Sequence, residues 1–262
     1  MTLYLELTSE FNAGRLRAVI SSGQAAVLHR LAIASKDGDW ILREDPEALD
    51  HVLGVLDRRG ARYRFGAPLD VRWMAGGWSA HLEFRRDSVR VRTDFFTRPP
   101  RVGADELRRM WAEQEGRDPP FTDARVLAEM KKTARQKDYP FIGELARRMA
   151  DPRERLLYSR SADDLIELGQ RYPDLAAELV RQRPLLARMG AGRRELAEAL
   201  QLEMLDLIEA FERRLADYRA ASADWAGLWP EVASEISGLS LREAHERIVE
   251  RAEGILPEGL RT

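Results

Sequence analysis

The sequence contains no cysteine and only four histidines, and both shortages exclude kinds of functional site. Without thiols there is no disulfide framework and no thiolate nucleophile. The histidines do not show the short ligand spacing that is typical of a zinc site. They stand at His29, His51, His81 and His245. Thiol nucleophiles and Cys/His metal centres are therefore excluded.

Long hydrophobic runs are also missing. No stretch approaches the roughly 20 apolar residues that a bilayer-spanning helix needs. The first residues, MTLYLELTSEF, have neither a basic start nor the apolar block of a signal peptide. With 262 residues, 44% of them hydrophobic, the chain can bury the core of one large or two modest domains. We therefore expect a cytoplasmic globular protein without a membrane partner.

Lysine is scarce, because only four of the 42 basic residues are lysines. They are Lys36, Lys131, Lys132 and Lys137. The formal net charge is −2, but residues 1–150 hold 26 basic and 22 acidic residues, whereas residues 151–262 hold 16 and 22. The N-terminal part therefore suits an anionic ligand better. Its excess of +4 is too small to indicate a protein that coats nucleic acid.

The sequence pattern changes near residue 150. Before it, the alternating segments LYLEL, RYRF, AHLEF and VRVRTDFF predict strands, and PEALDHVLGVLDRRG predicts a helix with a glycine stop. After it, the segments SADDLIEL and SLREAHERIVERAEGIL open on a serine followed three residues later by an acid, which is the capping-box arrangement. We predict an α+β or α/β domain over residues 1–150 and an all-helical domain over residues 151–262.

The longest predicted helix covers GRRELAEALQLEMLDLIEAFERRLADYRA and carries an apolar stripe. The stripe has helical spacing, so we expect it to belong to the core rather than to a partner surface. Its members are Leu196, Leu200, Ile208, Phe211 and Leu215.

Two aspartates separated by one residue stand in the segment SGQAAVLHRLAIASKDGDWIL, residues 22–42. Asp-Gly between apolar flanks is typical of a hairpin turn, which would leave both carboxylates in solvent. The preceding residues 24–34, however, are rich in alanine and leucine and favour a helix. If Asp37 and Asp39 begin a strand, their side chains leave the same face and can bind a hard divalent cation. Gly23 would then form a turn whose backbone N–H groups meet a phosphate.

These residues resemble the first motif of the nucleotidyltransferase superfamily of the DNA polymerase β type. That motif has a strand, a Gly-Gly or Gly-Ser turn, a helix and an Asp-x-Asp/Glu strand. Gly23 stands at the turn, residues 24–35 resemble the helix of the minimal and abortive-infection toxin-like members, and DGD at residues 37–39 resembles their Asp-Ile-Asp. The resemblance covers about residues 15–150. It implies an α+β fold, in which a mixed sheet with flanking helices precedes the helical domain.

The resemblance also implies a third carboxylate on a neighbouring strand. Asp94 in VRVRTDFF is the residue we favour for it, and Asp70 in PLDVRW is the alternative. The segment MKKTARQKDYPFIGELARRM, residues 130–149, resembles the lysine-rich helix that closes the catalytic region of the toxin-like members. Within it, Lys132, Arg135 and Lys137 are near enough on a helix to contact the β- and γ-phosphates of a nucleotide. Taken alone, this segment is more typical of a solvated charged face.

The implied activity is the transfer of a nucleoside monophosphate from a nucleoside triphosphate to a hydroxyl of unknown identity, on a protein, a tRNA or a small molecule. Magnesium or manganese would be bound by Asp37, Asp39 and Asp94. The nucleotide would be bound by Ser22, Gly23, Gln24, Lys36, Lys132, Arg135 and Lys137.

Two residues depart from the family pattern and support an alternative function. Gln24 follows the glycine where the family has a small residue, and Gly38 stands between the aspartates where the family has an apolar one. The alternative is a catalytically degraded binding or interaction module, such as the partner of an antitoxin in a toxin–antitoxin pair.

Two further features are expected to be structural. His29 lies on the predicted helix after the glycine turn and is better explained as a packing residue than as a base. Gly76 and Gly77 lie between Trp73 and Trp78 and predict a hairpin with aromatic packing, although a nucleobase could stack there. No local signature indicates a Ser-His-Asp triad.

Overall fold

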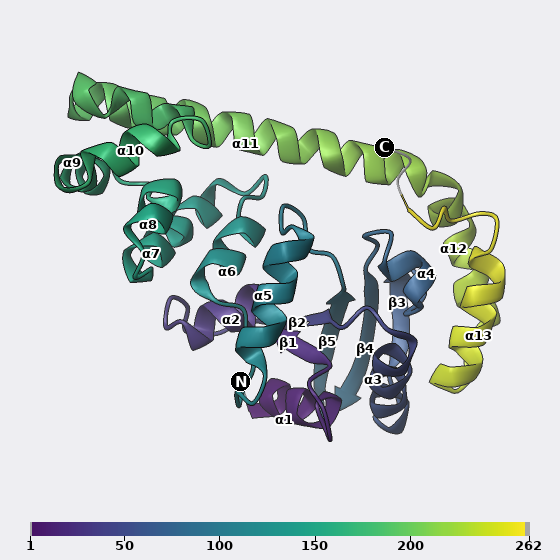
Figure 1. The fold of residues 1–262 in the computed structure, drawn as a ribbon. Coiled ribbons are helices and arrows are strands. Elements are labelled where there is room, and N and C mark those ends of the chain that lie inside the picture. The colour runs from purple at the N-terminus through teal and green to yellow at the C-terminus, as the bar shows by residue number, and fades with distance from the viewer. Residues whose placement is uncertain (1, 260–262) are drawn as a thin grey trace. The chain divides into compact units, whose positions relative to one another are not determined.

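The computed structural model describes residues 2–259 and has an α+β fold (Figure 1). Its contacts divide the chain into two compact units. The sheet unit runs up to Thr122 and resumes at Ala216, and the helical unit spans Asp123–Leu215. The sequence-based boundary near residue 150 is a different division, because it follows composition rather than contacts.

The sheet unit combines five strands with helices from both ends of the chain. Its strands are β1 (Ala18–Ile20), β2 (Asp37–Leu42), β3 (Arg62–Gly66), β4 (Ala80–Arg86) and β5 (Val89–Phe96). Its helices are α1 (Thr2–Phe11), α2 (Ser22–Leu28), α3 (Pro46–Arg58), α4 (Val71–Met74), α5 (Ala104–Gln114), α12 (Ala223–Glu235) and α13 (Leu241–Ala252).

The sheet is mixed and has the strand order β1-β2-β5-β4-β3. Strands β2 and β5 are parallel, and the other neighbours are antiparallel. Trp40 and Phe95 stack on one face of the sheet, and Phe11 of α1 packs edge-on against both rings. This face forms the hydrophobic core, with Trp40 and Phe95 fully buried.

The predicted strand LYLEL is wrong, because residues 2–11 form helix α1. Its buried residues are Tyr4, Leu7, Thr8 and Phe11, which fall at helical spacing. Alternation over only five residues cannot be told from one helical face, and contact with the sheet selects the helix.

The helix predicted over residues 24–34 is shorter than expected and ends at Leu28. Arg30 adopts a φ of 55°, and its N–H donates to the Val27 carbonyl while the Leu31 N–H donates to the Ala26 carbonyl. This is the hydrogen-bond pattern of a Schellman C-cap, which stops a helix. Residues 29–36 therefore form an irregular connection before β2.

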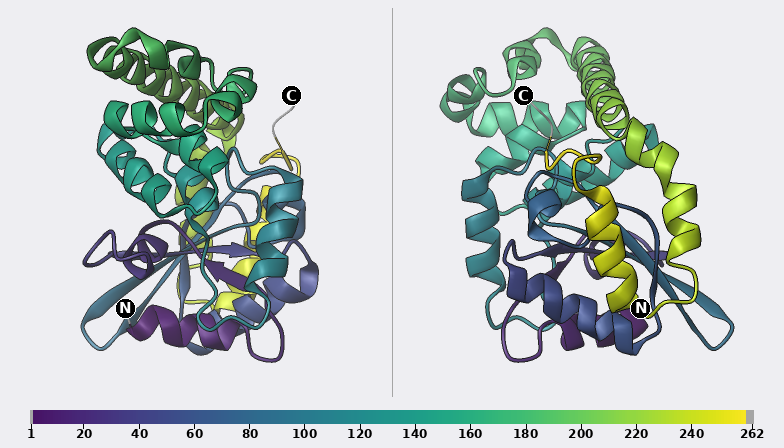
Figure 2. Two further views of the ribbon diagram at one scale, coloured as in Figure 1. Left: turned by 60° about the vertical axis from the view of Figure 1, so that its left-hand side comes forward. Right: turned by 90° about the vertical axis from the view of Figure 1, so that its right-hand side faces the viewer.

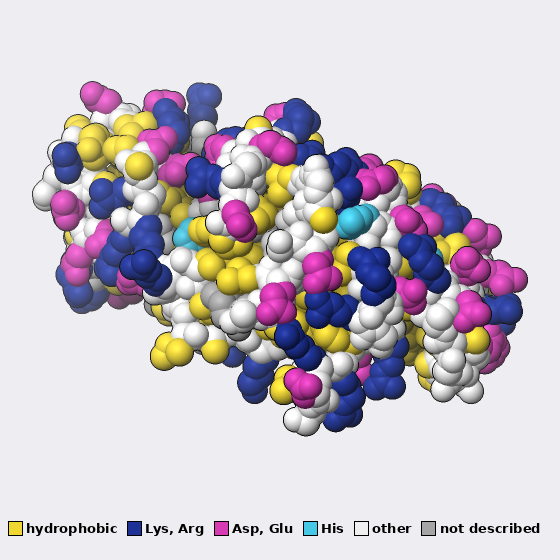
Figure 3. Space-filling view, turned by 90° about the horizontal axis from the view of Figure 1, so that it is seen from below, with side chains coloured by type: hydrophobic (Ala, Val, Ile, Leu, Met, Phe, Trp, Pro, Cys, Tyr) yellow, Lys and Arg dark blue, Asp and Glu magenta, His cyan; other side chains and the backbone are white. Residues whose placement is uncertain are grey.

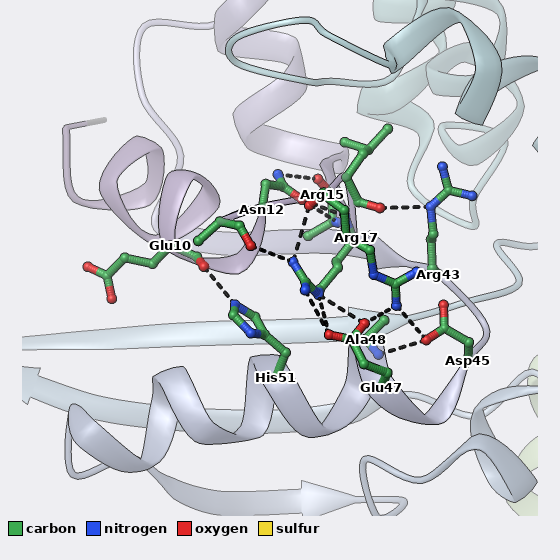
Figure 4. A network of polar contacts seen from close by, with 12 residues as sticks. Glu10, Asn12, Arg15, Arg17, Arg43, Asp45, Glu47, Ala48 and His51 are labelled. Carbon is green, nitrogen blue, oxygen red and sulfur yellow. Dashed lines mark hydrogen bonds and ion pairs between the residues drawn. The ribbon is translucent and has the colours of Figure 1, made fainter.

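A polar network holds the start of β1 against α3 (Figure 4). Arg17 is buried and donates from Nη2 to Oε1 of Glu47 at 2.7 Å. The Asn12 side-chain oxygen accepts from the backbone N–H groups of Arg17 and Ala18. Hydrogen bonds from Arg17 and then Arg15 hold the pKa of Glu47 at about 2. The network positions β1 and the turn that follows it.

The last helix returns to the sheet unit, where α13 packs against α3 and β3 (Figure 2). Tyr63 in β3 hydrogen-bonds to Nδ1 of His245 in α13 at 2.8 Å. The predicted capping box of α13 is confirmed, because Ser240 and Glu243 exchange both hydrogen bonds.

The helical unit is built from short helices around one apolar cluster. Its elements are α6 (Ala124–Met130), η1 (Gln136–Asp138), α7 (Tyr139–Arg148), α8 (Pro152–Tyr158), α9 (Ala162–Arg171), α10 (Pro173–Leu179), η2 (Pro184–Ala191) and most of α11 (Arg193–Ala221). The predicted serine cap of α9 is confirmed, because Ser161 accepts from the Asp164 N–H. Of the stripe predicted on α11, Leu196 and Leu200 lie in this core.

The long helix predicted over residues 130–149 is interrupted. Helix α6 ends at Met130, and α7 begins at Tyr139 with Pro140 in its first turn. Proline suits the start of a helix and disfavours its interior, since it lacks the N–H donor. The lysine-rich residues therefore lie in a turn and a short 3₁₀ helix instead of on one helical face.

Two surface features bear on earlier expectations. No helix within residues 2–259 is both long and apolar enough to cross a bilayer. On the face shown in Figure 3, acidic and basic side chains are intermingled, as expected for a chain with nearly balanced charge.

Candidate functional site

The polar face of the sheet brings together the aspartates that the sequence singled out. Asp37 and Asp39 both lie in β2, two residues apart, so their side chains leave the same face. In the parallel register of β2 with β5, Asp39 pairs with Asp94. The prediction that DGD begins a strand is therefore confirmed, and a hairpin turn at these residues is excluded.

One row of side chains continues from these aspartates across four strands. Asp39 pairs with Asp94, Asp94 with His81 of β4, and His81 with Phe65 of β3. We call these four residues the polar row. Neighbouring strands lie about 4.8 Å apart, so the row extends over roughly 14 Å of the sheet.

On the opposite face of β2, the Trp40 ring occupies the space where a side chain at Gly38 would lie. A Cβ atom at Gly38 would lie 2.4 Å from the Trp40 ring and 2.6 Å from the Tyr4 ring. The Trp40 indole is fully buried and donates to Oγ1 of Thr8 at 2.9 Å. The large ring occupies the volume of the missing side chain, so this departure from the family pattern leaves strand β2 intact.

The turn after β1 is joined directly to the aspartate strand. The Ser21 N–H donates to the Asp39 carbonyl at 2.9 Å, and Ser22 has a φ of 50°. At Gly23, a Cβ atom would lie 2.3 Å from Oγ of Ser35, so no side chain fits there without movement. Ser22 and Gly23 begin helix α2, so the glycine lies in the first turn of a helix beside the aspartate strand. Because α2 has only seven residues, we assign no ligand to its N-terminus.

Gln24 and Lys36 connect this turn to β2 in different ways. Gln24 is buried, and its Nε2 lies 3.2 Å from the Ser35 carbonyl and 3.3 Å from the Asp37 carbonyl. Its amide group thus holds the backbone before the aspartates. Lys36 is exposed, and its carbonyl accepts from the Tyr4 hydroxyl at 2.8 Å.

Asp94 is held by two basic side chains. Its Oδ1 accepts from Nη2 of Arg64 at 2.5 Å and from Nδ1 of His81 at 2.8 Å. Burial by itself would raise the pKa of Asp94, but the hydrogen bond and charge of His81 and the charge of Arg64 outweigh it and hold the pKa below its ordinary value. Asp94 is therefore ionised at neutral pH.

Asp37 differs, because one of its oxygens is buried without a hydrogen bond. Oδ1 of Asp37 has no hydrogen-bond partner among the described residues, although Nη1 of Arg92 forms an ion pair with it at 3.7 Å. The pKa of Tyr4 is raised by burial and then by the negative charges of Asp37, Asp39 and Asp94. A buried carboxylate oxygen without a donor is a position where a cation or a ligand donor would be favourable.

The arrangement suits a metal bound by two carboxylates better than one bound by three. Within residues 2–259, no group of three or more His, Asp and Glu side chains is arranged to hold a metal ion. Arg64 and His81 both contact Oδ1 of Asp94, so this carboxylate already has basic partners. Magnesium is usually bound by one or two carboxylates together with substrate phosphates, and Asp37 with Asp39 matches that donor set.

The remaining residues considered from sequence lie elsewhere in the sheet unit. Asp70 caps α4 by accepting from the Arg72 N–H and pairs with the Arg72 side chain, so it is not part of the polar row. His29 has its Nε2 2.9 Å from the Thr122 carbonyl and packs edge-on against Phe121, in agreement with its predicted structural role.

The lysine-rich segment belongs to the helical unit and forms local ion pairs. Nζ of Lys132 donates to Glu129 at 2.7 Å, and Nε of Arg135 donates to Asp138 at 2.8 Å. Lys137 is exposed in the 3₁₀ helix. Their role in binding phosphate stays a prediction.

Sequence reasoning did not identify the basic partners of the aspartates. Arg92, Arg64 and His81 come from three strands, and nothing in their local sequence links them to DGD. Nor did it foresee a chain of hydrogen bonds from Asp94 through His81 to Ser79, whose Oγ lies 3.1 Å from Nε2 of His81. The spacing of Arg92 and Asp94 on one face of β5 was the one available signal.

Comparisons with known proteins give a distant likeness. No family model and no curated protein sequence matches the chain. Among solved structures, the chain is similar to the crystal structure of a candidate nucleotidyltransferase from H. pylori, with 12% sequence identity and a TM-score of 0.40. The match covers 81% of this chain and 95% of the other.

Proposed function

We propose that this protein is a metal-dependent nucleotidyltransferase, which transfers a nucleoside monophosphate from a nucleoside triphosphate to a hydroxyl acceptor. The observation that carries the proposal is the buried Asp37 oxygen without a hydrogen-bond donor, two residues from Asp39 on the same strand face. The acceptor is a protein, a tRNA or a small molecule.

Each part of the site has a role in this proposal. Asp37 and Asp39 would hold magnesium or manganese, and the bound ion would supply positive charge against the triphosphate. Ser22 and Gly23 begin the seven-residue helix α2, and their role in phosphate binding stays a prediction. Nη1 of Arg92 lies 3.7 Å from Oδ1 of Asp37 and would supply positive charge beside the bound phosphates. Lys36, exposed one residue before β2, would contribute a further cation to phosphate binding.

The test is to incubate the protein with each α-labelled nucleoside triphosphate and magnesium, in parallel with a tRNA pool, a protein extract and a metabolite extract. Transfer leaves the labelled α-phosphate on the acceptor and releases pyrophosphate. In the Asp37→Asn, Asp39→Asn double variant we expect labelling to fall at least about a hundredfold, because charge stabilisation by the metal is worth several kcal/mol.

The matched control is Asp87→Asn. Asp87 lies between β4 and β5 at a φ of 55°, a conformation that asparagine tolerates, and it is exposed. Labelling by this variant should equal that of the wild type. Absence of a labelled acceptor in every pool would reject the transfer reaction.

A second candidate function is favoured by the ion pairs of Asp94. Because Arg64 and His81 already hold Asp94, the polar face could serve as a binding module that has lost transfer chemistry, as in the partner of an antitoxin. Triphosphate binding without a labelled acceptor would favour this alternative.

A further inference from the structure

An aromatic pocket lies at the far end of the polar row from Asp39. The cavity has a volume of about 240 Å³, and its lining includes Phe65, Trp78, Ser79, His81, Trp225 and Trp229. We call it the tryptophan pocket. All of its lining residues belong to the sheet unit.

The indole rings of the pocket are fixed by their N–H groups. Trp225 donates to the Gly66 carbonyl at 2.9 Å, and Trp229 donates to the Arg64 carbonyl at 3.1 Å. The two rings meet edge to face, with centroids 5.7 Å apart. Because the polar edges of the rings are already bonded to backbone, their apolar surfaces are left to line the cavity.

Phe65 is the accessible aromatic surface of the pocket. It stacks on the His81 ring with centroids 4.3 Å apart and an interplanar angle of 24°, yet 48% of the residue is exposed. A large aromatic side chain at the mouth of a pocket is a surface on which another flat ring can stack.

The pocket also has one polar edge. Nδ1 of His81 bonds to the Asp94 carboxylate, which can only accept, so Nδ1 carries the proton. Oγ of Ser79 lies 3.1 Å from Nε2 of the same ring. Ser79 and His81 thus place hydrogen-bonding atoms in the wall of a cavity that is mostly lined by apolar and aromatic side chains.

We infer that the tryptophan pocket binds a nucleobase. Cavities for drug-sized ligands measure roughly 300–1,000 Å³, so this smaller cavity suits one flat ring system. Nucleobases combine π faces for stacking with a hydrogen-bonding edge. Strand β4 with His81 lies two strands from Asp39, about 10 Å away, which is within the span of an extended nucleotide. The identification of the ring as a nucleobase rests on the proposed function.

The base can come from the donor triphosphate or from a nucleoside on the acceptor. Both sources share the same ring chemistry, so the first experiment uses nucleosides that carry no phosphate. We expect adenosine, guanosine, cytidine or uridine to bind the wild-type protein in titration calorimetry without metal, and ribose not to bind. Equal binding of ribose would overturn the inference.

Two variants test whether the nucleoside binds in the tryptophan pocket. Phe65→Leu removes an exposed ring but keeps an apolar side chain, and Trp229→Leu removes one wall. Loss of stacking should weaken nucleoside binding about five- to a hundredfold in each. The control Trp111→Phe, in α5 and outside the pocket lining, should leave the affinity unchanged. Unfolding midpoints confirm that each variant is folded.

The outcomes separate this inference from the proposed function. The Asp37→Asn, Asp39→Asn variant should bind nucleosides as the wild type does, because it leaves the pocket intact. Unchanged nucleoside affinity in both Phe65→Leu and Trp229→Leu rejects the pocket, even if labelled acceptors are found. Pocket-dependent nucleoside binding without labelled acceptors rejects only the transfer reaction.

Competition identifies the source of the base. If the pocket holds the donor base, a nonhydrolysable triphosphate with magnesium should displace the nucleoside one for one. If it holds an acceptor base, both should bind together. Either result supports the inference and assigns the base to one substrate.

Discussion

Glu203 in the helical unit and Asp37 in the sheet unit are both acidic residues beside arginine, but their oxygens are used differently. Arg183 donates to both oxygens of Glu203, at 2.9 and 2.8 Å, and Arg160 also donates to Oε2. Arg183 itself is only 5% exposed, and it bonds to the Leu156 and Ser159 carbonyls as well. This group is saturated with hydrogen bonds.

Asp37 is the opposite case, because its buried oxygen has an ion pair at 3.7 Å and no hydrogen bond. Asp94 lies between the two extremes, with one oxygen shared by Arg64 and His81. A saturated buried ion pair stabilises one packing arrangement, whereas an oxygen without a donor is better explained by a ligand. The comparison predicts different responses of the two regions to substitution.

The largest effect is expected at Arg183. In Arg183→Met the apolar volume is retained, but Glu203 loses two hydrogen bonds and two carbonyls lose their donor. Breaking a buried pair in this way costs about 3–5 kcal/mol of unfolding free energy. Urea denaturation of the variant and the wild type at pH 7 measures the loss. Arg194→Met, at an exposed arginine of α11, is the control and should change little.

A smaller effect is expected on acidification. Burial alone would raise the pKa of Glu203, but hydrogen bonds and charges of Arg183 and then Arg160 lower it below the ordinary value of 4.5. The unfolded state therefore binds more protons in this range, so the stabilisation is present above pH 4.5 and is lost as pH falls through the folded-state pKa.

The measurement compares unfolding midpoints of Glu203→Gln and the wild type at pH 7 and at pH 3. The difference between the two unfolding midpoints should be largest at pH 7 and smaller at pH 3, because pH 3 lies below the ordinary pKa of 4.5, where the unfolded carboxyl group binds a proton and the stabilisation declines. Glu212→Gln, at an exposed position of α11, serves as the control. A difference in midpoint that does not depend on pH would show that folding does not lower the pKa of Glu203.

The smallest effect on stability is expected at Asp37. Asp37→Asn removes a charge that has only a distant ion pair, so the unfolding free energy should change by less than about 0.5 kcal/mol. Asp94→Asn should cost more, about 1–3 kcal/mol, because Arg64 and His81 lose a charged acceptor. Urea denaturation of both variants measures the difference in unfolding free energy between these two aspartates. Equal losses of unfolding free energy in the two variants would mean that Asp37 contributes as much to folding stability as Asp94 does.

Local signals in the sequence predicted much of the secondary structure. The serine caps at Ser161 and Ser240 form as expected, and β2 begins at Asp37 as the strand reading of DGD requires. These features depend on residues within a few positions of each other. Strand register pairs Asp94 with Asp39, whereas Asp70 caps α4; the role of Asp94 as a metal ligand stays a prediction.

The failures arose where a local pattern was compatible with two structures. LYLEL alternates like a strand, but with Phe11 it also forms one helical face, and the sheet core selects the helix. The segment 130–149 has helical composition, but Pro140 and the turn before it divide it. In the sequence, Gln24 is a departure from the family pattern at the predicted phosphate site. In the structure its buried amide holds the backbone of residues 35 and 37.

The sequence alone excluded thiol chemistry and predicted that two aspartates share one strand face, because residue content and strand period are local properties. Only the tertiary structure decided which groups surround them. Strand register placed Asp94 and His81 in one row with Asp39, and helix α12 completed the tryptophan pocket from more than 130 residues beyond β4 along the chain. Such contacts depend on the register of distant strands and on burial, which no local pattern specifies.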